Sequence, residues 1–221
     1  MVFADRSEAG RLLAERLLRL GLERPVVLAL PRGGVPVGFA VARALDAPLD
    51  LVLVRKIGAP DQPELAVGAV VDGSRPETVL NRDIVRRLGL SERWIEAAAA
   101  GQLEEIERRR RLYFGGRART PVEGRTAIVV DDGIATGATM QAALHATRRA
   151  GPKTLVLAVP VAPPDTLERL RPDCDQIVCL AAPERFMAVG SFYADFTQVE
   201  DDEVRDLLRR ALPPQTPGPS A

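Results

Sequence analysis

Short apolar runs alternate with amphipathic segments along most of the chain. Runs that are apolar at consecutive positions, as expected of strands buried on both faces, lie at residues 26–30, 49–54, 127–130, 154–159 and 176–180. Segments with apolar residues at helical spacing lie at residues 7–20, 35–45, 137–150 and 201–212. The alternation predicts an α/β fold, a doubly wound parallel sheet whose ligands bind beyond the carboxyl ends of the strands.

The middle of the chain departs from this alternation. Residues 65–72 and 78–80 form two strand-like runs with no helical segment between them, which predicts an antiparallel excursion from the sheet. Residues 91–114 then carry apolar positions at helical spacing and predict one long helix. We therefore expect an insertion with helical content at about residues 73–118.

Four consecutive arginines, Arg108 to Arg111, lie near the end of that helix and could be mistaken for a polyanion-binding patch. Glutamates stand four residues before three of them, which is the orientation that favours ion pairs on a helix surface. The pairs are Glu104 with Arg108, Glu105 with Arg109, and Glu107 with Arg111. We therefore expect a solvated helix face rather than a binding patch.

The composition limits the class of protein. The chain has 221 residues, of which 46% are hydrophobic, so one sizeable core and a single domain over residues 1–212 are expected. A formal net charge of zero argues against a nucleic-acid partner, because nucleic-acid binding normally shows as a basic surface. The Pro-rich, polar residues 213–221 predict a disordered tail.

The cysteines and the N-terminal residues bear on the compartment. Cys174 and Cys179 are too few, and too poorly spaced, for a disulfide framework or a zinc site, so reduced thiols are expected. The N-terminal residues lack an apolar signal segment, and no apolar run approaches the ~18 residues of a membrane span. We expect a cytoplasmic protein without a membrane partner.

The residues with the clearest chemistry follow the apolar run at 127–130. Asp131 and Asp132 come first, and residues 135–139, Ala-Thr-Gly-Ala-Thr, then open a helical segment. The first N–H groups of a helix have no intrahelical partner, so this loop predicts a phosphate site, with Gly137 allowing close approach. Ribose hydroxyls can donate to the two carboxylates. The simpler alternative is that the acidic residues only end a strand and that Thr136 caps the helix.

This segment resembles a known family motif. Residues 129–139, Val-Val-Asp-Asp-Gly-Ile-Ala-Thr-Gly-Ala-Thr, are similar to the phosphoribosyl pyrophosphate (PRPP) motif of the type I phosphoribosyltransferases. The resemblance implies that Asp131 and Asp132 contact the ribose and act in catalysis. It implies that Ala135, Thr136, Gly137, Ala138 and Thr139 bind the 5-phosphate. Mg²⁺ would be carried with PRPP, with no separate metal site in the protein.

Two further segments are candidates for the diphosphate. Arg32, Gly33 and Gly34 follow the run at 26–30, at the position where the resembled family binds pyrophosphate. Arg55 and Lys56 follow the run at 49–54, and we expect both cations to face the same crevice. The alternative for this second pair is a surface basic pair before a loop. Residues 58–64 and 113–123 compete as the mobile lid.

The base-binding side is less sharply defined. Residues 183–190 resemble the hood of purine-type members, here about residues 181–200, and imply that Phe186 stacks on the base. Tyr193 adds aromatic surface, although core packing explains it nearly as well. Members that act on 6-oxopurines carry Asp where this chain has Ala135. That difference weakens hypoxanthine, guanine and xanthine as acceptors and leaves the base open.

The leading hypothesis is therefore a Mg²⁺-dependent phosphoribosyltransferase of nucleotide metabolism. Its partners would be PRPP and a small nitrogenous base, with a homodimer possible and no nucleic acid or membrane. The alternative is a PRPP-sensing regulatory or partner protein that binds without turnover. A helper in nucleic-acid uptake is a third hypothesis, which the zero net charge disfavours.

Overall fold

The core of the molecule is a five-stranded parallel sheet with the order β2-β1-β6-β7-β8. It is seen in a computed structural model that describes residues 2–72 and 76–211. The strands are β1 (Pro25–Ala29), β2 (Leu49–Leu51), β6 (Thr126–Val130), β7 (Thr154–Val161) and β8 (Gln176–Ala181). Every neighbouring pair runs parallel, which confirms the predicted doubly wound α/β fold.

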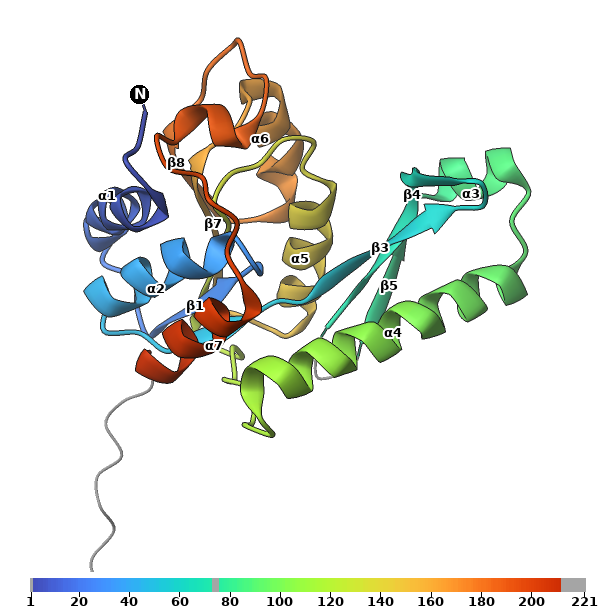
Figure 1. The fold of residues 1–221 in the computed structure, drawn as a ribbon, viewed down its shortest axis with the longest axis horizontal. Coiled ribbons are helices and arrows are strands. Elements are labelled where there is room, and N and C mark those ends of the chain that lie inside the picture. The colour runs from blue at the N-terminus through green and yellow to red at the C-terminus, as the bar shows by residue number, and fades with distance from the viewer. Residues whose placement is uncertain (1, 73–75, 212–221) are drawn as a thin grey trace, which may run out of the picture.

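Helices cover both faces of this sheet (Figure 1). One face carries α1 (Arg6–Leu18), α2 (Gly34–Ala44) and α7 (Asp201–Arg210), and the other carries α5 (Ala138–Arg149) and α6 (Pro164–Leu170). Successive strand residues point to opposite faces, so Val27 packs toward the first group of helices and Leu28 toward the second. The consecutive apolar positions in the sequence are explained by this two-sided burial.

A separate antiparallel sheet projects from the core and forms, with two helices, what we call the arm, residues 54–114 (Figure 1). Its strands are β3 (Val54–Ala59), β4 (Gln62–Val71) and β5 (Glu77–Leu80), followed by α3 (Arg82–Leu88) and α4 (Glu92–Phe114). Ser91 caps α4 by accepting a hydrogen bond from the Trp94 N–H, and Gly115 ends it in the left-handed conformation. The predicted antiparallel excursion and long helix are both confirmed.

The arginine run of α4 is engaged in ion pairs, as expected for Arg109 and Arg111, whereas Arg108 pairs with Glu105 instead of the predicted Glu104. Arg108 and Arg109 both pair with Glu105, at 2.7 and 2.8 Å, and Arg111 approaches Glu107 to 3.8 Å. Arg110 instead reaches Asp72 at the end of β4.

Several predicted boundaries are wrong. Residues 49–54 are not one strand, because β2 ends at Leu51 and Val54 already begins β3 of the other sheet. The insertion therefore starts earlier than residue 73. Residues 58–64 belong to the β3–β4 hairpin rather than to a loop. The tail predicted at residues 213–221 lies outside the described residues.

The N-terminal segment and the segment after β8 lie together. Phe3 forms a parallel bridge with Tyr193, and the Ala194 N–H donates to the Phe3 carbonyl at 2.8 Å. The second of these segments, residues 181–200, is the hood and includes the 3₁₀ helix η2 (Val189–Phe192). In the part of the chain that the structure describes, no helix is both long and apolar enough to cross a bilayer.

Two helical glycines should respond oppositely to substitution by alanine. A Cβ on Gly10 of α1 would lie 2.7 Å from the Ala40 Cβ and 2.8 Å from the Val37 carbonyl oxygen, whereas a Cβ on Gly101 of α4 meets open space. Gly10→Ala is therefore expected to lower the free energy of unfolding by about 1–3 kcal/mol through overpacking of α1 on α2. Gly101→Ala should raise it by about 0.5–1 kcal/mol. Urea unfolding of both variants measures the difference, and equal changes would contradict the close α1–α2 packing.

Candidate functional site

The candidate site lies where two loops leave adjacent strands of the parallel sheet. From β1 the chain enters α2 and returns to β2 on one side, whereas from β6 it enters α5 and returns to β7 on the other. The direction of winding thus reverses between β1 and β6, which is the position where doubly wound sheets bind ligands. The Leu30 N–H donates to the Val130 carbonyl at 2.9 Å, so the two loops start at the same level.

The loop after β6 ends in an open helix N-terminus. Gly137 has φ +81° and precedes α5, and among the described residues no side chain caps this end. The N–H groups of the first turn, from Ala138 onward, have no intrahelical acceptor. Ala135 and Thr136 are exposed, so the phosphate loop, residues 135–139, is accessible. Its uncapped amides and the helix dipole suit an anion.

A helix that the sequence did not predict braces this loop. The buried Thr166 of α6 donates its hydroxyl to the Ala135 carbonyl at 3.0 Å. Arg169 donates to the Thr136 carbonyl at 3.3 Å and to the Thr166 hydroxyl at 2.8 Å. These bonds occupy two carbonyls of the loop, whereas the N–H groups of the first turn of α5 have no intrahelical acceptor.

The acidic pair, Asp131 and Asp132, packs directly against the glycines of the other loop. A Cβ on Gly33 would overlap the Asp132 carboxylate, and one on Gly34 would lie 2.9 Å from the Asp131 Cα. Burial raises the pKa of Asp131 well above its ordinary value, and the neighbouring Asp132 charge raises it further. Burial also raises the pKa of Asp132, although hydrogen bonding by Arg6 opposes that shift.

The loop after β1 contributes Arg32, Gly33 and Gly34, here called the diphosphate loop. The peptide between Pro31 and Arg32 is cis. The Arg32 guanidinium lies 3.3 Å from the Glu200 carboxylate and 4.0 Å from Asp201, so it faces the start of α7. The structure thus brings this loop beside the acidic pair, with the arginine already paired to a carboxylate.

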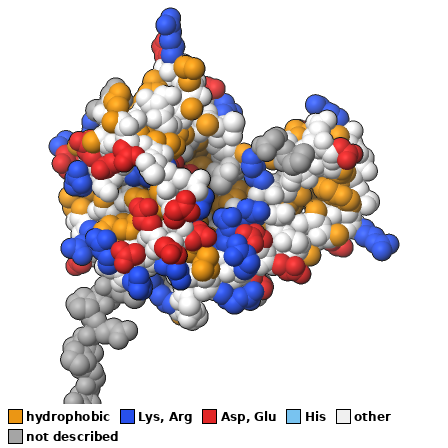
Figure 2. Space-filling view, in the orientation of Figure 1, with side chains coloured by type: hydrophobic (Ala, Val, Ile, Leu, Met, Phe, Trp, Pro, Cys, Tyr) orange, Lys and Arg blue, Asp and Glu red, His pale blue; other side chains and the backbone are white. Residues whose placement is uncertain are grey.

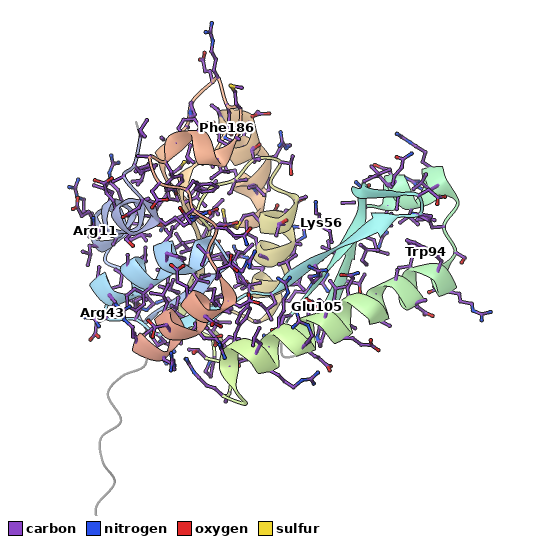
Figure 3. The ribbon with its side chains drawn as sticks, viewed as in Figure 1. Arg11, Arg43, Lys56, Trp94, Glu105 and Phe186 are labelled. Atoms are coloured by element: carbon purple, nitrogen blue, oxygen red, sulfur yellow. The ribbon has the colours of Figure 1, made fainter. Side chains whose placement is uncertain are left out.

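The expectation that Arg55 and Lys56 face one crevice is wrong. Both residues lie within β3, where adjacent side chains point to opposite faces of the sheet. The Arg55 Nε donates to Gln102 of α4 at 3.1 Å. Lys56 is on the other face, where it lines a cavity of about 230 Å³ with Ala138 and Gln141 of α5. Figure 3 shows Lys56 between β3 and α5, so of these two residues it is Lys56 that lies near the phosphate loop.

Phe186 and Tyr193, the two aromatic residues predicted to bind the base, lie in different environments within the hood. Phe186 is partly exposed and stacks on Phe192, with ring centroids 5.4 Å apart and an interplanar angle of 21°. Tyr193 is buried against Phe3 and donates its hydroxyl to the Asp132 carbonyl at 2.5 Å. These contacts favour a structural role for Tyr193, whereas Phe186 retains an accessible ring.

Comparison with known proteins agrees with this geometry. Residues 6–197 match the model of the phosphoribosyl transferase domain. The chain belongs to the phosphoribosyltransferase family. It is 51% identical over 211 residues, or 95% of its length, to a Mycobacterium tuberculosis protein named as a presumed phosphoribosyl transferase, and it spans 47% of that relative. It is also similar to the crystal structure of TT1426 from Thermus thermophilus, with 47% identity, a TM-score of 0.84, and coverage of 95% and 99% of the two chains.

Some contacts of this phosphoribosyltransferase domain could not be anticipated. Arg6 contacts Asp132 across 126 positions of sequence, and Glu200 contacts Arg32 across 168. Neither pair belongs to a local motif. Thr166 carries no sequence signal either, because the short helix α6 has only seven residues.

The buried Asp131 should make the ligand-free protein less stable as pH rises. Its pKa in the folded state is raised above the unfolded value of 3.8, so the folded state holds the proton longer and its stability falls above about pH 4. Asp131→Asn is therefore expected to increase the free energy of unfolding at pH 8, with the gain vanishing at pH 4. Urea unfolding at both pH values measures this difference.

Asp195→Asn is the matched control for that measurement. Hydrogen bonds from Thr197 lower the pKa of the exposed Asp195, so loss of its charge should destabilise the protein at pH 8. A gain from Asp131→Asn that is equal at both pH values would show that burial does not hold the proton.

Proposed function

We propose that the chain transfers the 5-phosphoribosyl group of PRPP to a nitrogenous base and releases pyrophosphate, with Mg²⁺. The supporting observation is the meeting of three parts at the ends of β1 and β6. These are an uncapped helix N-terminus, two carboxylates, and a glycine loop packed against them. Each part matches one portion of PRPP, and the family relationship supports the same class of reaction.

PRPP would span the site from α5 to the diphosphate loop. Its 5-phosphate would lie on the amides of residues 135–139, with the hydroxyls of Thr136 and Thr139 as further donors. The ribose hydroxyls would donate to the acidic pair. The diphosphate would lie against the backbone of Gly33 and Gly34, whose missing side chains make room for the acidic pair beside it.

The reaction exchanges one bond at the anomeric carbon for another. As the C–O bond to pyrophosphate breaks, the leaving group takes the electron pair and positive charge develops on the ribose. The nearby carboxylates of Asp131 and Asp132 would stabilise that charge, and Arg32 would stabilise the departing anion. A base nitrogen then forms the C–N bond and releases its proton to solvent.

Mg²⁺ is compatible with the donor atoms that are present. Carboxylate oxygens are the protein ligands it prefers, and in phosphate-transfer sites it commonly uses one or two of them together with substrate oxygens. Asp131 and Asp132 could supply those ligands, with the remainder from PRPP. When bound, the ion would neutralise charge on the pyrophosphate. Within residues 2–72 and 76–211, no cluster of three His, Cys, Asp or Glu residues suits a metal by itself.

The acceptor base would enter beside the hood. Phe186 presents its ring there, stacked on Phe192, as a platform for a planar heterocycle. Ala135 offers no side chain that could exchange a proton with a 6-oxopurine. We therefore propose a base other than hypoxanthine, guanine or xanthine as the acceptor.

PRPP binding should depend on the acidic pair. Wild-type protein at 100 times the dissociation constant of PRPP should gain about 2.7 kcal/mol of stability, seen as a raised melting temperature. Asp131→Asn combined with Asp132→Asn should abolish that gain, because the ribose hydroxyls lose their charged acceptors. Asp83→Asn, an exposed change in the arm, is the control and should leave the gain intact. Undiminished protection in the double variant would place the ribose elsewhere.

Turnover separates the transferase from a PRPP sensor. Incubation with PRPP, Mg²⁺ and a panel of purine and pyrimidine bases should release pyrophosphate with at least one base. Phe186→Ala should raise the KM for that base by about tenfold, since a stacking contact is worth on the order of 1–3 kcal/mol. Tight PRPP binding without release for any base would identify a sensor instead.

A further inference from the structure

An ion pair joins the first residue of α1 to the acidic pair. The Arg6 Nε donates to the Asp132 carboxylate at 2.8 Å, and the two side chains are only 11% and 14% exposed. Ion pairs at the surface contribute little, whereas a pair that is largely shielded from water interacts more strongly. Because Asp132 packs against Gly33, this ion pair lies beside the diphosphate loop and can affect how a ligand binds there.

Further contacts fix the orientation of the Arg6 guanidinium. Its Nη1 donates to the Thr197 carbonyl at 2.8 Å. Its central carbon lies 3.9 Å from the centroid of the Phe196 ring, which is a close cation–π arrangement. Arg6 therefore cannot turn away from Asp132 without also leaving the hood.

Asp132 is the point at which these elements meet. The Tyr193 hydroxyl donates to its carbonyl, and its N–H donates to the Asp131 carboxylate at 2.9 Å. Its own carboxylate fills the space that a side chain on Gly33 would need. A shift of Asp132 would therefore disturb the hood, the acidic pair and the diphosphate loop together.

The positive charge of Arg6 matters for PRPP binding because both the acidic pair and the ligand are negatively charged. Two adjacent carboxylates beside a phosphate and a diphosphate repel the ligand unless positive charge lies close to them. Arg6 provides that charge at hydrogen-bonding distance from Asp132. Arg55 does not, since it is turned toward α4.

We propose that Arg6 is a positioning residue of the PRPP site, which holds Asp132 against the diphosphate loop and offsets its charge so that PRPP can bind. This role rests on the proposed function. It differs from a purely structural link between α1 and the hood, because a structural link predicts a lower melting temperature without a change in PRPP affinity.

Calorimetric titration of PRPP at several Mg²⁺ concentrations tests this role. Arg6→Gln should weaken PRPP binding by about tenfold at saturating Mg²⁺ and make binding depend more steeply on Mg²⁺, because Asp132 then lacks its counter-charge. Arg6→Lys keeps the charge but loses the planar fork, so it should restore part of the affinity. Arg11→Gln is the matched control, since Arg11 is an exposed arginine of the same helix and should bind as wild type (Figure 3).

A double-mutant cycle with Asp132→Asn isolates the charge effect. In the Asp132→Asn background, Arg6→Gln should cost clearly less PRPP affinity than in the wild type. Additive losses would overturn the proposal, and so would an Arg6→Gln variant that binds PRPP as tightly as wild type or more tightly. If Arg6→Gln does not fold, Arg6→Lys carries the test, and unchanged affinity in that variant would likewise overturn it. Failure of wild-type protein to bind PRPP would instead reject the proposed function itself.

Discussion

The structure depends on the contact between the glycines after β1 and the carboxylates after β6. Asp132 can lie where it does only because residue 33 has no side chain, and Gly34 permits the same approach to Asp131. This contact requires β1 and β6 to be neighbours, with their helices on opposite faces of the sheet. The need for glycine at positions 33 and 34 thus follows from the close approach of two loops at the topological switch point.

That contact also carries an electrostatic cost. The pKa values of Asp131 and Asp132 are raised because burial disfavours their charged forms. Arg6 offsets part of the cost at Asp132, while a bound ribose could donate hydrogen bonds to both carboxylates. Burial of the acidic pair therefore lowers the stability of the ligand-free protein at pH values above the ordinary pKa of aspartate.

The sequence predicted those features that depend on local pattern. The two-sided burial of β1, β6 and β7, the long helix α4 and the loop at residues 135–139 are all encoded within a few residues. The prediction that Arg55 and Lys56 face the same crevice was wrong because it depended on where the preceding strand ends. Once β2 stops at Leu51, the two cations lie inside β3 and point apart. The Arg6–Asp132 pair was beyond prediction, since it joins residues from opposite halves of the chain.

The arm is joined to the site through the start of α7. The Tyr113 hydroxyl, at the end of α4, donates to Asp201 at 2.6 Å, and Arg32 of the diphosphate loop lies near Glu200 and Asp201. Burial and the hydrogen bond to Asp201 raise the pKa of Tyr113 to about 12, so its hydroxyl remains a donor even in mildly alkaline solution. Beyond this contact between α4 and α7, the surface is hollowed between the arm and the core (Figure 2). Acidic and basic side chains are interspersed on the face in view. Arg32 of the diphosphate loop and Tyr113 of α4 thus both contact the first turn of α7.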